Sequence, residues 1–452
     1  MDKISLAEVL QVTNAETDSA AEIFFEGVTT DSRKITGGTL FVALKGENFN
    51  GEDFAQDALK KGAAAVLVSK NFNKNIDGII IKVDDTLTAY RQIAGAWRNR
   101  FDIPIVAVTG SNGKTTTKDL VAAALNSLGN VQKTSGNFNN EVGVPMTLLE
   151  LNDKHKAAVV EIGMRGLGQI ETLAQVVKPT IGIVTNVSEA HIELLGSIEN
   201  IARAKGELVE AIQAGGTIIL NADNVHTVGM KNLVRDGVKI LTYGLENEAD
   251  FVAKNILIGS VSTEFTLSFR GKEYDFEIPM LGRHNVSNAL AAIAAGYAVG
   301  LSVPEVQRGF STLTTTKMRF EVIRRDGLTI INDAYNASPA SMRVAIKTTA
   351  EIYNGKLIAV LGDMLELGDI SERVHKEIGA FLAENKFDTL ITLGELGRFI
   401  AEGAREAGLK NIYSFDTHED AAKKILELVR DGDTILFKAS HVMHMEKIIE
   451  LI

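Results

Sequence analysis

The arrangement of apolar and polar positions in the middle of the chain alternates between strand-like and helix-like stretches. Short, continuously apolar runs end near residues 108, 163, 187 and 223, and helical periodicity fills the stretches between them. Strands that are apolar along their whole length and separated by helices are typical of a parallel sheet covered on both faces. This part of the chain therefore predicts a doubly wound, mostly parallel α/β sheet.

Residues 250–281 follow a different pattern. Apolar and polar side chains alternate with period two from Val261 to Phe269, which is typical of a half-buried strand. A helix is expected at 285–300, directly after this segment. We therefore expect an antiparallel appendage to the central sheet.

Two smaller α/β units are expected on either side of the central one. Residues 39–46 and 63–69 are strand-like and surround a helical stretch, and residues 85–101 are helical and lead toward the next strand. After about residue 313 four more apolar runs occur between helical stretches. The sequence thus predicts an α/β protein of three domains, with a small N-terminal unit, a central sheet and a C-terminal Rossmann-like unit, divided as 1–84, 85–313 and 314–452.

Composition narrows the possible functions. The chain has 452 residues, 45% of them hydrophobic, and a formal net charge of −11. That charge argues against a nucleic-acid partner. The absence of cysteine excludes disulfides, thiolate chemistry and cysteine-bound zinc. No apolar run approaches the roughly 18 residues of a membrane span, and the N-terminus has no signal-peptide pattern, so we expect a cytoplasmic protein without membrane insertion.

The segment VAVTGSNGKTTTKDL, residues 106–120, carries the clearest chemistry. An apolar strand leads into a glycine turn and then into a helix that begins with Lys114 and Thr115. Glycines allow backbone N–H groups to face an anion, and the helix N-terminus favours negative charge. The spacing, G-x-x-G-K-T-T, is shorter than the usual P-loop, and a glycine turn that only caps the helix is the competing interpretation. We expect a nucleotide-phosphate loop formed by Gly110, Ser111, Asn112, Gly113, Lys114, Thr115 and Thr116.

Several polar residues at predicted strand ends are further candidates. Glu161 and Asp333 each end an apolar run, where open α/β sheets bind ligands, and His191 follows another such run. Each also has an ordinary interpretation: an edge carboxylate without a role, or an incidental hydrogen-bonding histidine. Lys205 lies in a helical stretch, normally a solvated position. Ser338 before Pro339 is typical of a helix cap, which accounts for part of the segment after Asp333.

Four segments together resemble the Mur ligase family, and the resemblance covers nearly the whole chain. Residues 29–54 resemble its uridine-nucleotide domain, TGSNGKTTTK its ATP loop, and NDAYNASPASMRVAI its third-domain signature. GNFNNEVGVPMTLLEL resembles the muramoyl-substrate stretch of the branch that adds a dipeptide. The Asp-Asn-Pro-Arg motif of the branch that adds the third residue is absent. Folate polyglutamate ligases share the ATP loop but are not expected to have the N-terminal uridine domain.

The resemblance implies an ATP-dependent ligase. Family members phosphorylate the carboxylate of a nucleotide substrate, here UDP-N-acetylmuramoyl-tripeptide, and an incoming amine, here that of D-alanyl-D-alanine, attacks the acyl phosphate. Such chemistry requires mainly positioning and charge neutralisation. Closure of the domains then excludes water. We expect ATP, two Mg²⁺ ions and a monomeric enzyme of peptidoglycan precursor synthesis.

The resemblance also assigns roles to single residues. Lys114, Lys205 and His191 are the implied catalytic residues. The implied Mg²⁺ ligands are Thr115 and Glu161 for one ion, with His191 and a Lys205 converted to a carbamate for the other. Further contacts with ATP are implied for Asn288, Arg319 and Asp333, with the UDP end for Ser32 and Arg33, and with the muramoyl end for Asn139 and Asn140.

The chain departs from the family pattern at two places. The family usually has Lys-Gly-Ser followed by Arg or a small polar residue, where this chain has Lys438-Ala439-Ser440-His441. Lys317 stands before Met318-Arg319, where glycine is common. Residues 362–368, GDMLELG, are a candidate loop for the acceptor dipeptide.

Two other classes of protein remain as alternatives. A P-loop switch or motor is not expected to carry a separate uridine domain. A noncatalytic binder of wall precursors is expected to have lost Lys114, Glu161 or Asp333, and all three are present.

Overall fold

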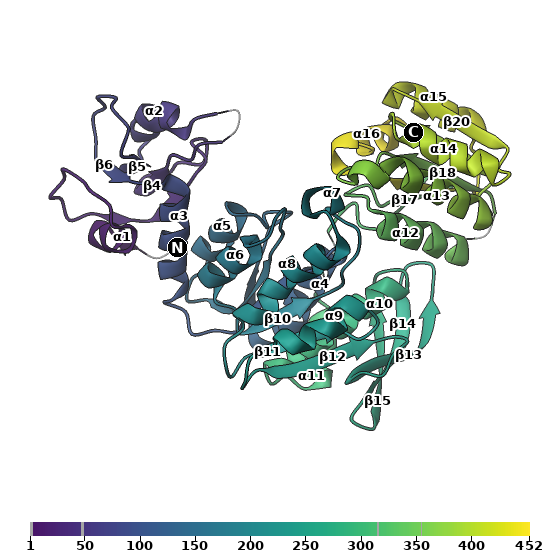
Figure 1. The fold of residues 1–452 in the computed structure, drawn as a ribbon, viewed down its shortest axis with the longest axis horizontal. Helices are drawn as coiled ribbons and strands as arrows, with labels where there is room; N and C mark the ends of the chain where they lie inside the picture. Colours follow the sequence, from purple (N-terminus) through teal and green to yellow (C-terminus); the bar gives the residue numbers. More distant parts are fainter. Residues whose placement is uncertain (1–2, 47–48, 314–315, 354) are drawn as a thin grey trace.

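The computed structural model describes residues 3–46, 49–313, 316–353 and 355–452. The strands form three large sheets in three successive parts of the chain, which Figure 1 shows in purple, teal and green to yellow. The predicted α/β class, with a mostly parallel central sheet between two smaller units, is confirmed. The exact division at 84/85 and 313/314 stays a prediction, and residue 314 lies outside the described residues.

The N-terminal sheet has four parallel strands in the order β3-β4-β5-β6. Both expected strands are present as β4 and β5, and the two edge strands were not expected. The elements are β1 (Ile4–Ser5), α1 (Leu6–Thr13), β2 (Phe24–Phe25), β3 (Gly27–Thr29), β4 (Thr39–Val42), η1 (Gly51–Phe54), α2 (Ala55–Lys60), β5 (Ala65–Ser69) and β6 (Ile80–Val83).

Helix α3 (Thr86–Arg98) joins this unit to the central one. Its side chains Tyr90 and Trp97 are buried in a core that includes residues of both units. Trp97 Nε1 donates a hydrogen bond to the Leu151 carbonyl at 3.1 Å, and Arg98 Nε donates to the Val177 carbonyl at 2.7 Å. The two units therefore share a continuous core through α3.

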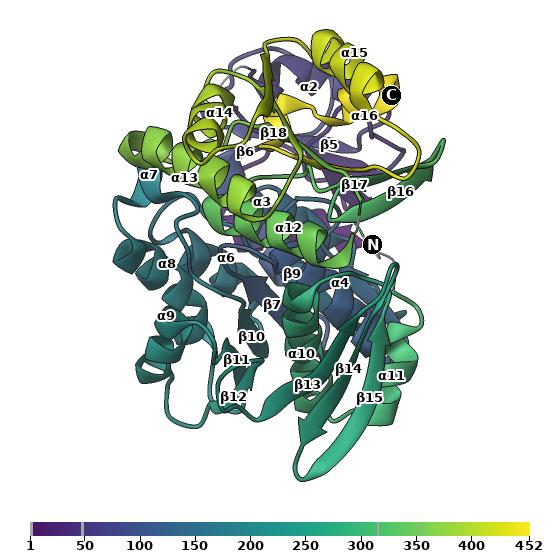
Figure 2. The ribbon, with the colours of Figure 1, turned by 90° about the vertical axis from the view of Figure 1, so that its right-hand side faces the viewer.

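The central sheet has nine strands in the order β15-β14-β13-β12-β11-β10-β7-β9-β8. Pairing is parallel from β8 to β13 and antiparallel from β13 to β15, which confirms the predicted appendage (Figure 2). The strands are β7 (Ile105–Thr109), β8 (Asn130–Lys133), β9 (His155–Glu161), β10 (Ile181–Val184), β11 (Thr217–Asn221), β12 (Lys239–Gly244), β13 (Phe251–Ile258), β14 (Thr263–Phe269) and β15 (Lys272–Ile278).

Helices cover both faces of the inner, parallel part of the central sheet, which explains why β7, β9, β10 and β11 are apolar along most of their length. Along β7, Ala107 belongs to the core cluster shared with α3, whereas Val106 and Val108 belong to the cluster around α4 and α10. The helices are α4 (Lys114–Leu125), η2 (Asn126–Leu128), α5 (Gly143–Leu149), α6 (Gln169–Val177), α7 (Ile192–Leu195), α8 (Ile198–Ala211), α9 (Val225–Gly229), η3 (Met230–Leu233), α10 (Arg283–Ala298) and α11 (Val303–Phe310).

The C-terminal sheet has six strands in the order β16-β17-β21-β18-β19-β20, all parallel except the edge strand β16. The four expected strands are β17, β18, β19 and β21. The elements are β16 (Glu321–Arg325), β17 (Leu328–Asn332), α12 (Pro339–Ile352), β18 (Leu357–Gly362), η4 (Gly368–Ile370), α13 (Ser371–Glu384), β19 (Thr389–Leu393), α14 (Gly397–Glu406), β20 (Asn411–Phe415), α15 (His418–Leu428), β21 (Thr434–Lys438), η5 (His441–Met443) and α16 (Glu446–Leu451).

The segment that leads into the C-terminal unit is tied to the phosphate-loop helix. Asp119 on α4 accepts a hydrogen bond from the Thr316 hydroxyl and pairs with Lys133 at 2.7 Å. The neighbouring Lys118 donates to the Thr134 carbonyl at 3.0 Å. The start of the C-terminal unit is thereby held beside α4. In the described parts of the chain, no helix has the length and apolarity needed to cross a bilayer.

Candidate active site

A cavity of about 1250 Å³ lies between the central and C-terminal units. On the side of the central unit it is lined by the segments that follow β7, β9 and β10. On the side of the C-terminal unit it is lined by the segments that follow β17, β18 and β21. Most of the predicted site residues line it: Ser111, Asn112, Gly113, Lys114, Thr115, Thr116, Asn139, Asn140, Glu161, His191, Asn288, Arg319 and Asp333. Gly110, Lys205, Ser32 and Arg33 are not among the lining residues.

The phosphate loop is shaped by two glycines and by the end of β10. Gly110 and Gly113 have φ of 149° and 79°, and a Cβ on Gly113 would lie 2.7 Å from Asn288 Oδ1. The Asn112 N–H donates to Asn186 Oδ1 at 2.9 Å, and the Thr185 hydroxyl donates to the Asn112 carbonyl at 2.6 Å. The loop is thus preformed around backbone N–H groups at the start of α4.

Lys114 folds back over this loop. Its Nζ donates to the Gly110 carbonyl at 2.7 Å and to the Ser111 carbonyl at 3.2 Å. Burial lowers the pKa of Lys114, while nearby Glu161 raises it and nearby Arg319 lowers it further. An anion at the loop would restore the stability of the charged ammonium.

Glu161 brings to the same cavity a carboxylate oxygen without a hydrogen-bond partner in the described parts of the chain. The residue is 1% exposed at the end of β9. One carboxylate oxygen, Oε1, accepts from Asn139 Nδ2 at 2.7 Å, and the other, Oε2, is buried without a partner among the described residues. A buried carboxylate oxygen without a donor is costly. The position therefore suits a cation that a ligand brings with it.

Within the described residues, no group of three or more His, Asp or Glu side chains is arranged to hold a metal ion by itself. Magnesium is commonly held by one or two carboxylates together with substrate phosphates, because it keeps part of its shell from water and ligand oxygens. Glu161 and the Thr115 hydroxyl beside the phosphate loop fit such a shared site. The donor set thus fits a magnesium ion bound together with a nucleotide.

Lys205 is buried, contrary to the solvated-lysine interpretation. It lies on α8, is 1% exposed, and its side chain makes no hydrogen bond or ion pair in the described parts of the chain. Burial, and then the positive charge of Lys114, lower the pKa of Lys205 well below its usual value. A buried amine without a counter-ion is expected to be neutral, and a neutral amine is nucleophilic.

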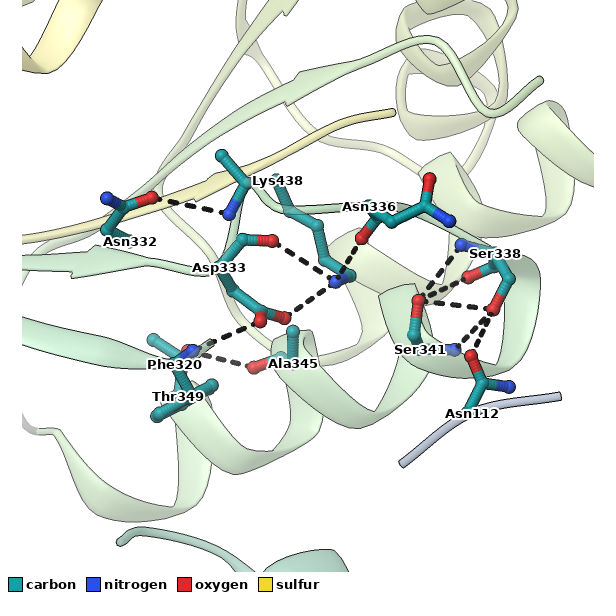
Figure 3. A network of polar contacts seen from close by, with 11 residues as sticks. Asn112, Phe320, Asn332, Asp333, Asn336, Ser338, Ser341, Ala345, Thr349 and Lys438 are labelled. Carbon is teal, nitrogen blue, oxygen red and sulfur yellow. Dashed lines mark hydrogen bonds and ion pairs between the residues drawn. The ribbon is translucent and has the colours of Figure 1, made fainter. Parts of the chain in front are cut away.

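The C-terminal unit reaches the phosphate loop through several contacts. Arg319 Nη2 donates to the Thr115 hydroxyl at 3.2 Å, and its guanidinium lies 3.9 Å from the centre of the Tyr335 ring. The Ser338 hydroxyl donates to Asn112 Oδ1 at 2.9 Å (Figure 3). Ser338 also caps α12, as the sequence predicts. Residues from two sheets therefore meet over one loop.

Asp333 is held by a buried lysine. Lys438 Nζ lies 2.6 Å from Asp333 Oδ2 and donates to the Asn336 carbonyl at 3.0 Å, and the Phe320 N–H donates to Asp333 Oδ1 at 3.1 Å (Figure 3). Sequence reasoning missed Lys438 and Tyr335 as members of the site. The signals were a lysine that ends an apolar strand and an aromatic residue within the third-domain signature.

His284, which also lines the cavity, should make stability dependent on pH. Burial lowers the pKa of His284 from 6.5 to about 4. The negative charge of Asp333 acts against this shift, and the positive charge of Lys438 adds to it. Between these values the unfolded chain binds more protons than the folded one, so stability falls as the pH falls through this window. From pH 7.5 to 5 we expect the wild type to lose about 2 kcal/mol more than His284→Gln in urea titrations. Equal losses in both proteins would contradict the lowered pKa of His284.

The predicted substrate contacts differ in their surroundings. Arg33 is exposed and pairs with Asp31 at 2.8 Å in the N-terminal unit, outside the cavity. Asn140 Oδ1 accepts from the Gly143 N–H at 2.9 Å, at the start of α5. Asn139 lies against Glu161. The structure thus brings Asn139 and Asn140 to the cavity but does not bring Ser32 or Arg33 there.

Three family models match successive parts of the chain. They are described as "Mur ligase family, catalytic domain" at residues 25–98, "Mur ligase middle domain" at 108–296 and "Mur ligase, glutamate ligase domain" at 318–441. The chain is 41% identical to UDP-N-acetylmuramoyl-tripeptide–D-alanyl-D-alanine ligase of Bacillus subtilis, over 99% of this chain and 97% of that protein. Identity with the Escherichia coli protein of the same name is 35%, over 99% and 98%.

Solved structures agree with these relatives. MurF from Acinetobacter baumannii superposes with a TM-score of 0.93 at 30% identity, over 100% of this chain and 98% of that one. MurF of Thermotoga maritima in complex with ADP has a TM-score of 0.84 at 28% identity, over 94% and 96%. The three-domain fold, with a nucleotide loop that faces the third domain, is that of an ATP-dependent ligase class. The chain belongs to the Mur ligase family. Within that family it aligns end to end with the ligases named for D-alanyl-D-alanine addition.

Proposed function

We propose that this chain joins D-alanyl-D-alanine to UDP-N-acetylmuramoyl-tripeptide in peptidoglycan precursor synthesis, with conversion of ATP to ADP and phosphate. The end-to-end similarity to ligases of that name supports the assignment. The observation that carries the chemistry is the shared cavity, in which three groups surround one phosphate loop. They are Lys114, Arg319 of the C-terminal unit and the Glu161 carboxylate oxygen that has no partner among the described residues.

In the first step, the loop N–H groups and Lys114 hold the phosphates of ATP, and Lys114 stabilises the negative charge that develops on the γ-phosphate. A carboxylate oxygen of the tripeptide attacks that phosphorus, the bond to ADP breaks, and an acyl phosphate forms. Arg319 approaches the same phosphates from the C-terminal unit. Asn288 and Asp333 complete the ATP contacts.

In the second step, the dipeptide amine attacks the acyl carbon, loses a proton, and expels phosphate. Water competes with the amine for the acyl phosphate, so the cavity between the two units has to close around the substrates. Ser338 and Arg319, which contact the phosphate loop from the C-terminal unit, contribute to that closure.

Magnesium fits the donor set described above. Thr115 and Glu161 would hold one ion with the phosphates, and His191 and a modified Lys205 would hold a second. Bound there, magnesium neutralises phosphate charge and polarises the acyl oxygen. The Lys205 ammonium cannot bind a metal, but its neutral amine can attack carbon dioxide, form a nitrogen–carbon bond and release a proton. The product is a carbamate, which is an anionic oxygen ligand.

The remaining assignments concern substrates and setting. Ser32 and Arg33 would contact the UDP end and Asn139 and Asn140 the muramoyl end of the nucleotide substrate. Because Ser32 and Arg33 lie in the N-terminal unit, the substrate would extend from there to the cavity. We further propose a monomer that acts in the cytoplasm.

A coupled assay tests this function. ATP, UDP-N-acetylmuramoyl-tripeptide and D-alanyl-D-alanine are offered together and in each pair. We expect steady release of ADP and phosphate only with all three substrates, because the acyl phosphate is consumed by the amine. Steady release without the dipeptide would replace the ligase assignment by an ATPase.

A further inference from the structure

Glu366 of the C-terminal unit contacts the segments that follow β9 and β10 in the central unit. Glu366 lies in the loop after β18, the GDMLELG segment of residues 362–368. The loop is fixed within its own unit, because the Met364 N–H donates to His375 Nε2 at 2.9 Å and the Leu365 N–H donates to Ser440 Oγ at 3.0 Å. Glu366 is therefore presented from a rigid support.

Among the described residues, the hydrogen-bond and ion-pair partners of Glu366 belong to the central unit. Its Oε2 forms a hydrogen bond with His191 Nδ1, and its Oε1 lies 3.8 Å from Arg165 Nη2. The Glu193 N–H donates to the Glu366 carbonyl at 3.3 Å. Arg165 follows β9, whereas His191 and Glu193 follow β10. In Figures 1 and 2, α7, which begins directly after His191, lies against the C-terminal unit.

The backbone on both sides of this contact is unusual. Glu366 has φ of 62° and His191 has φ of 66°. Residues other than glycine rarely adopt this left-handed region of the backbone. Such conformations persist where surrounding contacts hold them, and they occur often at functional sites. Two disfavoured residues that contact each other across the two units indicate a contact with a function.

The contact also determines how the imidazole is presented. A carboxylate at Nδ1 keeps the proton on that nitrogen and leaves Nε2 as an acceptor. Carboxylates that orient metal-binding histidines in this way typically change activity by about 10- to 100-fold when removed. In this structure the orienting carboxylate, that of Glu366, belongs to the C-terminal unit, whereas His191 belongs to the central unit.

We propose that Glu366 is a positioning residue that orients His191 when the C-terminal unit docks on the central unit. Docking of the C-terminal unit then also brings the His191 imidazole into its working orientation. The proposal rests on the role of His191 in the proposed function. Glu366 has no covalent part in the reaction. It acts through His191 and holds the two units together, with Arg165 as a second partner.

The test combines kinetics with a measurement of docking. Glu366→Gln keeps the shape of the side chain and removes its charge. We expect kcat to fall by about 10-fold or more, with KM for ATP changed less than about two-fold, because the phosphate-loop contacts remain. In a His191→Ala background, Glu366→Gln should lower kcat far less than it does in the wild type. A further fall of similar size would show that Glu366 does not act through His191, and would overturn the proposal.

Docking can be measured without substrates. Since the chain has no cysteine, a dye pair on Lys231→Cys and Lys423→Cys, both at exposed positions, reports the distance between the central and C-terminal units. We expect Glu366→Gln to broaden the energy-transfer distribution of the ligand-free protein and to reduce the docked fraction. Glu366→Asp should recover part of both effects.

Glu377→Gln is the matched control, because Glu377 forms ion pairs with Arg343 and Arg373 on the exposed side of the same unit. It should leave kcat and docking unchanged. Wild-type kcat or wild-type energy transfer in Glu366→Gln would overturn the proposal. If the wild-type protein had no ligase activity, the proposed function would be wrong. The energy-transfer measurement would still test whether Glu366 stabilises docking of the two units.

Discussion

Replacement of Lys114 by alanine is expected to lower kcat by about 10²-fold or more while the protein stays folded. The ammonium lies over the phosphate loop, 2.7 Å from the Gly110 carbonyl, and burial lowers its pKa. A phosphate that approaches the loop supplies negative charge beside this partly buried cation, and charge develops further on the γ-phosphate as it is transferred. The lost interaction is therefore stronger in the transition state than in the bound ATP complex.

Steady-state kinetics with all three substrates checks this expectation, with thermal unfolding as the test of folding. Lys231→Ala is the control, because Lys231 is an exposed lysine of the same unit, and it should behave as the wild type. An unchanged kcat in Lys114→Ala would mean that the loop binds something other than the transferred phosphate.

Replacement of Lys205 by alanine is expected to remove nearly all activity, with kcat lower by about 10²-fold or more. The side chain is 1% exposed, has no ion-pair partner in the described parts of the chain, and its pKa is lowered well below the usual value by burial and by Lys114. If its neutral amine carries a carbamate, alanine removes an anionic metal ligand. Acetate or another short carboxylate should then restore part of the activity, because it can occupy the space of the carbamate.

Depletion of bicarbonate gives an independent readout, since wild-type activity should fall in depleted buffer and return when bicarbonate is added. Arg203→Ala, an exposed cation on the same helix, should respond to neither treatment. Near-normal turnover in Lys205→Ala would return this lysine to a structural role and leave His191 to hold the second metal with other ligands.

The elements that sequence patterns predicted best are those with buried, continuously apolar strands. β7, β9, β10 and β11 are covered on both faces, so the middle of each strand is apolar. The edge strands β3, β6, β8, β16 and β20 were missed because neighbouring helices and sheets cover them incompletely. β16 (Glu321–Arg325) reads EVIRR and has no buried residue, so nothing in its pattern distinguishes it from a loop.

The site was predictable where chemistry depends on local sequence. The glycines, Lys114 and Thr115 follow one another along the chain, and the structure brings them to one loop. The burial of Lys205 was also within reach, because it stands four residues after Ile201 and three before Leu208, on the apolar face of α8. Side-chain type alone made it look like a surface residue.

Contacts between distant parts of the chain were not predictable from the sequence. The pairing of Asp333 with Lys438 depends on the parallel order β17-β21, and the contact of His191 with Glu366 depends on how the C-terminal unit docks. Neither the strand order nor the docking leaves a local pattern in the residues concerned. These contacts nevertheless decide which way the carboxylate and the imidazole point.

The most direct test of the account is the fate of the oxygen atoms of the reacting carboxylate. UDP-N-acetylmuramoyl-tripeptide labelled with ¹⁸O in that carboxylate is incubated with ATP, D-alanyl-D-alanine and the enzyme, and the released phosphate is analysed by mass spectrometry. If the cavity forms an acyl phosphate that the amine then attacks, each phosphate carries a single ¹⁸O atom from the carboxylate and the other label stays in the new amide. Phosphate without ¹⁸O, released at the rate of ADP formation, would contradict the account.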